Sequence, residues 1–300
     1  MPVYNSGDTL RAAINSVLSQ TYKDFDFIIV DDGSTDNSKE VITSFKDPRI
    51  KYYKISHSGR SYASNYGISK SETDFIARID SDDIFFSNKL ELQINYLNNN
   101  PNISVIFSHS VLFDDSLRLR YWKCPESNAD IKYQLMYLNP INHSSVIFRK
   151  SIVTDVSGYS EEMDVNEDYD LWLRISKIAE FHCINEYLVF TRLKNNNDIK
   201  LKYNTELKEM LLQYLKSSDV NDSKEISDIK GRIEYYYGDL QKARLNLLNG
   251  HLLKNFKLLL MAFIPESLHR KYRGNKYSML FSADMVRSEY YKRILKGMLN

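Results

Sequence analysis

The sequence predicts an α/β fold in which a mostly parallel sheet is flanked by helices and followed by a helical C-terminal extension. Short apolar runs typical of strands alternate with segments whose apolar residues recur at helical spacing. Two of these runs end directly in acidic turns, the run 25–30 at residues 31–32 and the run 75–79 at residues 80–83. Because strand, polar turn and helix follow one another repeatedly, right-handed crossovers and a mostly parallel sheet are expected.

The N-terminal part is expected to alternate strands and helices, beginning with almost no strand. The first helix, which Asp8 is expected to cap, starts so early that little chain precedes it. A strand at 25–30, a helix around 41–45, a strand at 50–55 and a helix at 61–69 follow.

The central part is expected to continue the alternation and then to become helical. The strand at 75–79 is followed by a helix at 88–98, a strand at 103–107, a helix at 130–138, a strand at 142–148 and a helix that opens at Glu167. Beyond residue 193 the pattern is helical and charged to residue 300. The expected domains are therefore 1–197 and 198–300.

The acidic cluster at residues 80–83 suggests a bound cation. Asp80, Asp82 and Asp83 place three carboxylates within four positions, where like charges repel one another. Mg²⁺ and Mn²⁺ prefer carboxylate oxygens and share their coordination with water and substrate phosphates. A solvated acidic turn that caps the next helix is an equal alternative on spacing alone.

The two acidic turns are expected to line one crevice. In open α/β sheets, ligands bind beyond the carboxyl ends of the strands. Neither turn is glycine-rich, and the sequence contains neither a G-x-G-x-x-G nor a Walker A pattern, so backbone amides are not expected to hold phosphates. This predicts diphosphate binding through a metal.

Composition indicates a globular chain of ordinary core content. The 300 residues are 43% hydrophobic, and the two cysteines, Cys124 and Cys183, lack the spacing of a zinc or redox motif, so both are expected to be buried thiols. The longest apolar run, 258–264, is too short to span a bilayer. A cytoplasmic protein is expected, peripheral at the inner face of the cell membrane if it docks there.

The charge is distributed unevenly along the chain. Residues 240–300 carry 12 Lys and Arg against 3 Asp and Glu, whereas residues 1–239 carry 28 against 36. Between residues 252 and 276 an apolar segment adjoins a cationic one, which suits docking on an anionic membrane surface. A helical subdomain that packs on the rest of the chain is the equal alternative, and no nucleic-acid partner is expected.

Six motifs in the first two thirds of the chain resemble family 2 glycosyltransferases of the GT-A fold, of the kind that build bacterial polysaccharides. They occur in the order typical of that family. The motifs are Met1–Asn5, Ser19–Tyr22, Val30–Asp36, Ala63–Ile68, Asp80–Asp83 and Glu167–Arg174.

The resemblance implies a UDP-sugar donor and a divalent metal, Mn²⁺ or Mg²⁺. It places the nucleoside beside Pro2, Val3 and Tyr4, and the uracil ring N–H on Asp32. The other roles that it implies are Asp80 at the ribose, Asp82 as a metal ligand, Asp83 supporting the metal site and Arg60 near the nucleotide or phosphates.

The resemblance also implies that Asp168 is the general base that removes a proton from an acceptor hydroxyl. Attack with one base implies inversion of the anomeric centre. Glu167, Trp172 and His143 are candidates for the acceptor side, each with a structural alternative. Glu167 can cap its helix, Trp172 can be a core residue at helical spacing, and His143 can be structural.

Two departures from the family pattern stand against this assignment. Relatives carry about five apolar residues before the stretch that here starts at Met1, and many have a histidine where this chain has Lys194. The expected function is a hexosyl- or N-acetylhexosaminyltransferase acting on a glycan or lipid-linked saccharide. The alternative is a non-catalytic sugar-nucleotide-binding or scaffold protein of the same fold.

Overall fold

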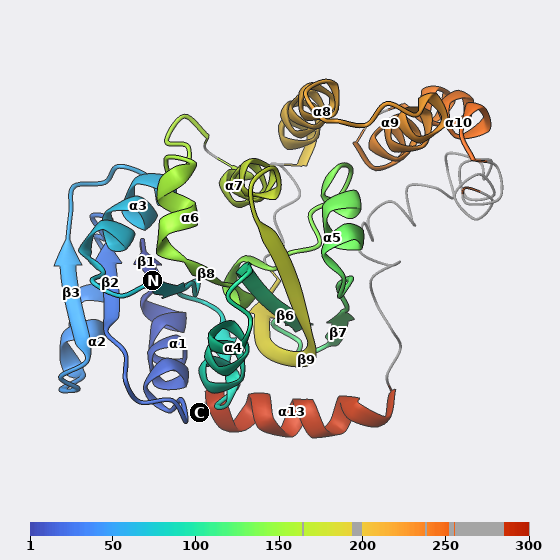
Figure 1. Ribbon diagram of the computed structural model, residues 1–300. Helices are drawn as coiled ribbons and strands as arrows, with labels where there is room; N and C mark the ends of the chain where they lie inside the picture. Colours follow the sequence, from blue (N-terminus) through green and yellow to red (C-terminus); the bar gives the residue numbers. More distant parts are fainter. Residues whose placement is uncertain (164, 194–199, 238, 252–254, 256–284, 300) are drawn as a thin grey trace. The chain divides into compact units, whose positions relative to one another are not determined.

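The computed structural model describes residues 1–163, 165–193, 200–237, 239–251, 255 and 285–299 (Figure 1). The chain divides into two compact units. The first contains residues 1–131, 141–194 and 280–300, and the second contains residues 132–140 and 195–279. Residues 280–300 therefore group with the N-terminal unit, while the functional domain boundary expected at residue 197 stays a prediction.

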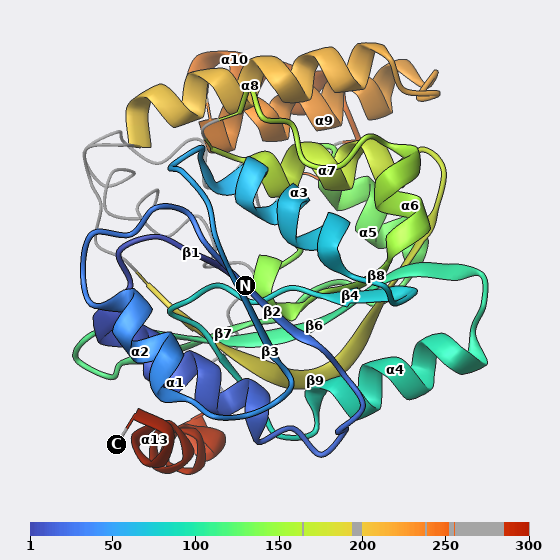
Figure 2. The same cartoon turned by 90° about the vertical axis from the view of Figure 1, so that its left-hand side faces the viewer.

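The first sheet is three-stranded and entirely parallel. Its order is β1 (Pro2–Val3), β2 (Phe27–Asp31) and β3 (Ile50–Lys54). Helices α1 (Gly7–Leu18) and α2 (Ser38–Ser44) cover one face, and α3 (Arg60–Lys70) lies on the other, as Figure 2 shows. The predicted α/β fold with a parallel sheet flanked by helices is confirmed.

The second sheet is mixed. Its order is β4 (Phe75–Ala77), β8 (Ile147–Arg149), β6 (Ile103–Phe113), β9 (Glu180–Arg192) and β5 (Ile84–Phe85), with β7 (Leu119–Trp122) paired to β6. The long strands β6 and β9 run parallel, and the shorter strands pair antiparallel with their neighbours. The short strands β5 and β7 were not predicted, because two to four residues give too little pattern to recognise.

The helices predicted at 88–98, at 130–138 and from Glu167 are present with shifted boundaries, whereas the short helices at 143–145 and 150–155 were not predicted. In the first unit the remaining helices are α4 (Lys89–Asn99), η1 (His143–Ser145), α6 (Lys150–Asp155), α7 (Glu167–Ser176) and α13 (Met285–Leu299). Helix α5 (Asn128–Leu135) leads into the second unit, which holds α8 (Lys200–Lys216), α9 (Ser223–Tyr237) and α10 (Leu240–Asn249). The strand expected to start near residue 142 is corrected: the Asn142 side chain accepts the Ser144 N–H and starts a 3₁₀ turn.

The first strand is as short as the sequence indicates. β1 pairs with β2 only at Val30 and Asp31. A hollow of about 390 Å³ extends past it, lined by apolar residues of β2 such as Phe27 and of β4 such as Ile76. The core of this unit is otherwise closed by α1, whose Leu10 and Ile14 are fully buried.

Helix α13 completes a second apolar cluster of the first unit. Its Tyr291 and Leu295 are buried against Val111 and Phe190 of the mixed sheet. The helix also lies beside α1 (Figure 2). Nearly all of the basic segment 252–276, for which membrane docking was hypothesised, lies outside the described residues. Among the described helices, each is too short or too polar to cross a membrane.

Candidate active site

A cleft of about 450 Å³ opens where β1, β2 and β4 end. It brings together all the residues that were predicted for the donor and the metal. The lining residues are Pro2, Val3, Tyr4, Ser6, Asp32, His57, Arg60, Ala63, Asp80, Ser81, Asp82, Asp83, Thr191 and Arg192. Two acidic turns far apart in the sequence thus share one crevice, as the position of ligands in open α/β sheets leads one to expect.

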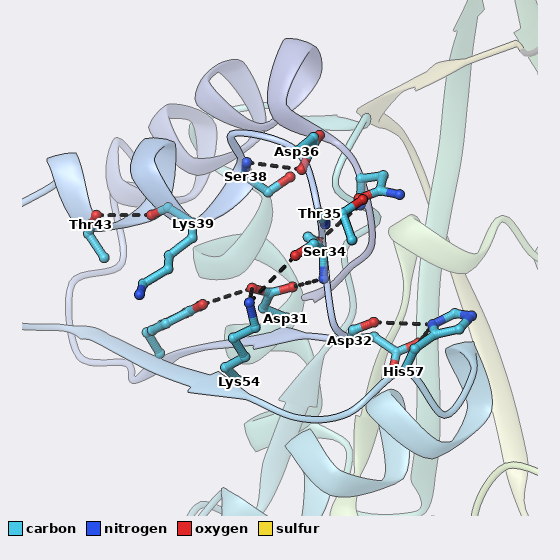
Figure 3. A network of polar contacts seen from close by, with 12 residues as sticks. Asp31, Asp32, Ser34, Thr35, Asp36, Ser38, Lys39, Thr43, Lys54 and His57 are labelled. Carbon is cyan, nitrogen blue, oxygen red and sulfur yellow. Dashed lines mark hydrogen bonds and ion pairs between the residues drawn. The ribbon is translucent and has the colours of Figure 1, made fainter.

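Asp32 is held firmly at one end of the cleft. Its carboxylate accepts the backbone N–H groups of Ser58 (2.7 Å) and Gly59 (3.0 Å) and lies 2.9 Å from Nδ1 of His57 (Figure 3). The His57 ring stacks on Tyr4, with 4.1 Å between ring centroids. His57 was not predicted, although its position just beyond the strand 50–54 was a usable signal.

The preceding residue, Asp31, has a structural task. It is fully buried and accepts the Ser34 N–H and the Tyr52 hydroxyl, each at 2.8 Å. These bonds fix the turn that presents Asp32 (Figure 3). Gly33 in this turn has φ +75°, and a Cβ at this position would lie 2.8 Å from the backbone nitrogen of His57. The tight turn therefore needs glycine.

Asp80 is an ionised carboxylate whose side chain is 34% exposed. Arg78 donates to its Oδ1 at 2.8 Å, and the Asp80 N–H donates to the Ser144 hydroxyl at 2.9 Å. Burial opposes ionisation, but the charges of Arg78 and Arg60 outweigh it and hold the pKa of Asp80 below its usual range. Arg78 and Ser144 were missed by sequence reasoning.

Asp83 has the opposite electrostatic environment. Its Oδ1 accepts the Arg192 N–H at 3.0 Å. Burial and the charges of Asp80 and Asp82 raise its pKa well above the usual value for a carboxyl. A cation placed at this turn would relieve that repulsion.

The acidic turn offers a divalent metal few ligands from the protein. Among the residues that the structure describes, no three carboxylates converge within ligand distance. One or two carboxylates are what Mg²⁺ and Mn²⁺ sites usually take from the protein when phosphates and water supply the rest. Asp82 and Asp83 therefore fit such an ion.

Helix α7 opens with the pair Glu167 and Asp168. Asp168 accepts the Tyr169 N–H at 2.8 Å, and Glu167 is buried and pairs with Arg60 at 3.1 Å. Burial, together with the charge of Glu167, raises the pKa of Asp168 to about 7. Arg60 thus connects α7 to the cleft that it also lines.

The other acceptor candidates lie in or near the core. Trp172 is fully buried and packs against His143 and Phe148, with ring centroids 6.1 and 6.3 Å away. The indole offers no exposed face for stacking on a sugar, so the structure favours the core alternative. His143 lies 2.8 Å from the Tyr159 hydroxyl, and burial with nearby Arg78 lowers its pKa well below 6.5. Lys194 lies outside the described residues.

Comparison with known proteins assigns these features to one family. The family described as glycosyl transferase family 2 matches residues 1–154. A UDP-Glc:alpha-D-GlcNAc-diphosphoundecaprenol beta-1,3-glucosyltransferase of Escherichia coli is 33% identical over 187 residues, 62% of this chain and 71% of that protein. An uncharacterized glycosyltransferase of Rickettsia conorii is 32% identical over 209 residues, 67% of this chain. The alignment spans only 34% of that relative's length.

Solved structures show the same fold at low sequence identity. Residues 1–349 of TarS from S. aureus match with a TM-score of 0.60 and 15% identity over 92% of this chain and 91% of that one. The same protein in complex with UDP-GlcNAc matches with a TM-score of 0.60 and 14% identity, over 97% and 90% of the two chains. A mannosyltransferase of Pyrobaculum calidifontis in complex with GDP-Man and Mn²⁺ gives a TM-score of 0.57 at 12% identity, over 92% and 82%.

Proposed function

Because the chain belongs to glycosyl transferase family 2, we propose that it transfers a hexosyl or N-acetylhexosaminyl group from a UDP-sugar to a hydroxyl of a saccharide acceptor. One observation carries the proposal. The turns after β2 and β4 place Asp32 and the carboxylates of residues 80–83 in the same cleft as the cation Arg60. A nucleoside diphosphate has hydrogen-bond donors that a carboxylate such as Asp32 can accept. Its phosphates carry negative charges that Arg60 and a metal ion at the acidic turn can bind.

The nucleoside end of the donor is assigned to the Asp32 side of the cleft. Tyr4 is 47% exposed and stacks on His57, so the two rings form an aromatic wall beside the Asp32 carboxylate. A pyrimidine ring can lie against such a wall while its ring N–H donates to Asp32. The UDP-Glc named for the Escherichia coli relative and the UDP-GlcNAc bound to TarS support uracil as the base.

The diphosphate is assigned to the acidic turn. Asp82 and Asp83 would hold Mn²⁺ or Mg²⁺, and Asp80 would contact the ribose. A bound metal neutralises charge on the leaving diphosphate. The Mn²⁺ in the complex of the Pyrobaculum calidifontis mannosyltransferase supports this assignment. Arg60 adds a second positive charge on the same wall.

The general base of the transfer is assigned to Asp168. A carboxylate with a pKa of about 7 is half ionised at neutral pH, so it accepts a proton from a hydroxyl more readily than an ordinary aspartate does. Attack by the acceptor opposite the leaving diphosphate inverts the anomeric centre. Glu167 would lie beside the acceptor and keep the pKa of Asp168 high.

The acceptor is proposed to be a glycan or a lipid-linked saccharide. The diphosphoundecaprenol in the name of the Escherichia coli relative supports a lipid-linked one. Such an acceptor would make docking of the basic C-terminal segment on the inner face of the cell membrane useful. Binding to anionic vesicles that weakens with salt would support this part, and no binding at low salt would contradict it.

Donor hydrolysis and transfer with and without Mn²⁺ test the proposal. Within a panel of UDP- and GDP-sugars, we expect a UDP-sugar to raise the melting temperature of the protein. In the Asp82→Asn variant, we expect Mn²⁺ no longer to stimulate hydrolysis and transfer. A fully active metal-free enzyme would contradict the metal assignment. A chain that binds the donor without hydrolysis or transfer would support the non-catalytic alternative.

A further inference from the structure

A second group of ligand-type side chains lies in the mixed sheet, apart from the cleft. His109 is on β6, Cys183 is on the neighbouring β9, and Cys124 follows β7 on the other side of β6. All three side chains are buried, with exposures of 2%, 1% and 8%. One ligand atom from each lies within 4.8 Å of the others. Three separate segments therefore bring a nitrogen and two sulfur atoms to one point.

A hydrogen bond sets the orientation of the His109 ring. Nε2 lies 3.0 Å from Oδ1 of Asn185, an acceptor, so Nε2 carries the proton. Nδ1 then has its lone pair on the side of the sulfur atoms, 3.5 Å from Sγ of Cys183. Metal-binding histidines almost always have such a partner on the other ring nitrogen, because it fixes the tautomer and the ring plane.

The distances fit a tetrahedral ion. Zinc sits about 2.3 Å from sulfur and about 2.0–2.1 Å from nitrogen, which separates two ligands by about 3.5 Å. That is the separation of the Cys183 sulfur from Nδ1 of His109. The Cys124 N–H also donates to Nδ1 at 3.3 Å, so a metal ion at Nδ1 would replace this long hydrogen bond.

The charges also fit Zn²⁺. Two thiolates and a neutral imidazole around one Zn²⁺ have a net charge of zero, which suits a buried place. A free thiol is protonated at neutral pH, and cysteine binds a metal as the thiolate. Binding therefore releases two protons, one from each thiol, and forms two Zn–S bonds and one Zn–N bond.

We propose that His109, Cys124 and Cys183 supply three ligands of a zinc-binding site that ties β6, β9 and the segment after β7 together. Its task is structural, because none of the three residues lines the catalytic cleft. The competing explanation is that the same atoms make only S–H···N and N–H···N hydrogen bonds in a metal-free core.

Cobalt substitution separates the two explanations. Cys124 and Cys183 are the only cysteines of the chain, so an absorption band from thiolate-to-Co²⁺ charge transfer reports on this site alone. The full chain is reduced, stripped of metal and given Co²⁺ in excess Mg²⁺, once as folded protein and once during refolding, because the site is buried. We expect one Co²⁺ per chain with a thiolate band, displaced by one equivalent of Zn²⁺.

Variants locate the site. Cys183→Ser and His109→Gln should lose the band, and Asn185→Ala should weaken metal binding by about 10- to 100-fold, as loss of such hydrogen-bond partners does elsewhere. His182→Gln is the matched control, since His182 neighbours Cys183 in the strand but stacks on Tyr96. It should keep the band. Asp82→Asn should also keep it, which separates this site from the proposed metal at the cleft.

Absence of the thiolate band in both the folded and the refolded native chain would overturn the proposal, provided that circular dichroism shows the fold. An unchanged band in the Cys183→Ser variant would overturn it too. Full binding by the His109→Gln variant would remove the histidine from the ligand set.

Discussion

Asp80 and Asp168 are both half-buried carboxylates of the first unit, yet their pKa values move in opposite directions. Arg78 and Arg60 outweigh the effect of burial on Asp80 and lower its pKa. The neighbour of Asp168 is Glu167, whose charge adds to burial and raises the pKa to about 7. One residue type thus provides an ionised group at the proposed donor side and, at the proposed acceptor side, a carboxylate that titrates near neutral pH.

Removing the acceptor-side carboxylate should have the largest effect. We expect Asp168→Asn to lower kcat by about 10²- to 10⁴-fold, the usual contribution of a general base. The affinity for the donor should hardly change, because the base acts on the acceptor. Transfer assays and donor titration by calorimetry measure the two quantities. An unchanged kcat would remove Asp168 from the mechanism.

Replacing Arg78, the cation that pairs with Asp80, should act mainly on the stability of the fold. Arg78→Met leaves the Asp80 carboxylate, whose side chain is 34% exposed, without its partner, which costs about 1–2 kcal/mol of unfolding free energy. Guanidinium unfolding at pH 7 measures the loss, and the double variant with Asp80→Asn should recover part of it. In the native chain the Asp80 contribution is full above about pH 4 and declines as the pH falls through the lowered pKa. Equal stability of native chain and variant would contradict the ion-pair account.

The dependence of kcat/KM on pH tests whether the charge of Glu167 raises the pKa of Asp168. The acid limb of kcat/KM should rise toward a plateau above about pH 7, because Asp168 must be ionised to act. Glu167→Gln removes a neighbouring negative charge, so the pKa of Asp168 falls and the limb moves to lower pH, by up to about one unit. The exposed Glu162→Gln is the control, and it should leave the limb in place. A limb that moves upward would show that Glu167 does not raise the pKa of Asp168.

The smallest effect is expected at the aromatic wall. His57→Ala removes one hydrogen bond to Asp32 and the ring on which Tyr4 stacks, while the Ser58 and Gly59 N–H donors remain. Loss of one aromatic contact costs about 1 kcal/mol, so donor affinity should fall about fivefold with kcat preserved. His182→Ala serves as the distant control. A loss in kcat without a change in donor affinity would place His57 at the reaction centre instead.

The sequence predicted most of the fold and the meeting of the two acidic turns in one cleft, for physical reasons. Strand runs that end in acidic turns have a known relation to ligand position, so the sequence alone suffices to assign Asp32 and Asp82 to one cleft. Short strands such as β5 leave no periodic signal. Arg78 could not be recognised, because whether a strand arginine pairs with the next acidic residue depends on the fold around it.

Tertiary context decides the surroundings of Trp172 and of the two cysteines, which were predicted to be buried thiols and are buried. Trp172 and the apolar positions of its helix have the same spacing whether the indole faces solvent or core, and the structure buries it. Cys124 and Cys183 show no motif in the sequence, because the sheet order, and not their spacing, brings them beside His109.

The position of α13 affects how the chain folds while the ribosome synthesises it. Its Tyr291 packs 5.7 Å from Phe86, between ring centroids, although the second compact unit is synthesised between them. At about 5–20 residues per second, the ribosome needs roughly 5 to 20 s to pass from the end of β9 to the end of α13. During that interval Val111 and Phe190 lack the cover that α13 gives them in the folded chain. We therefore expect the nascent first unit to expose an apolar, aggregation-prone surface until α13 has been made.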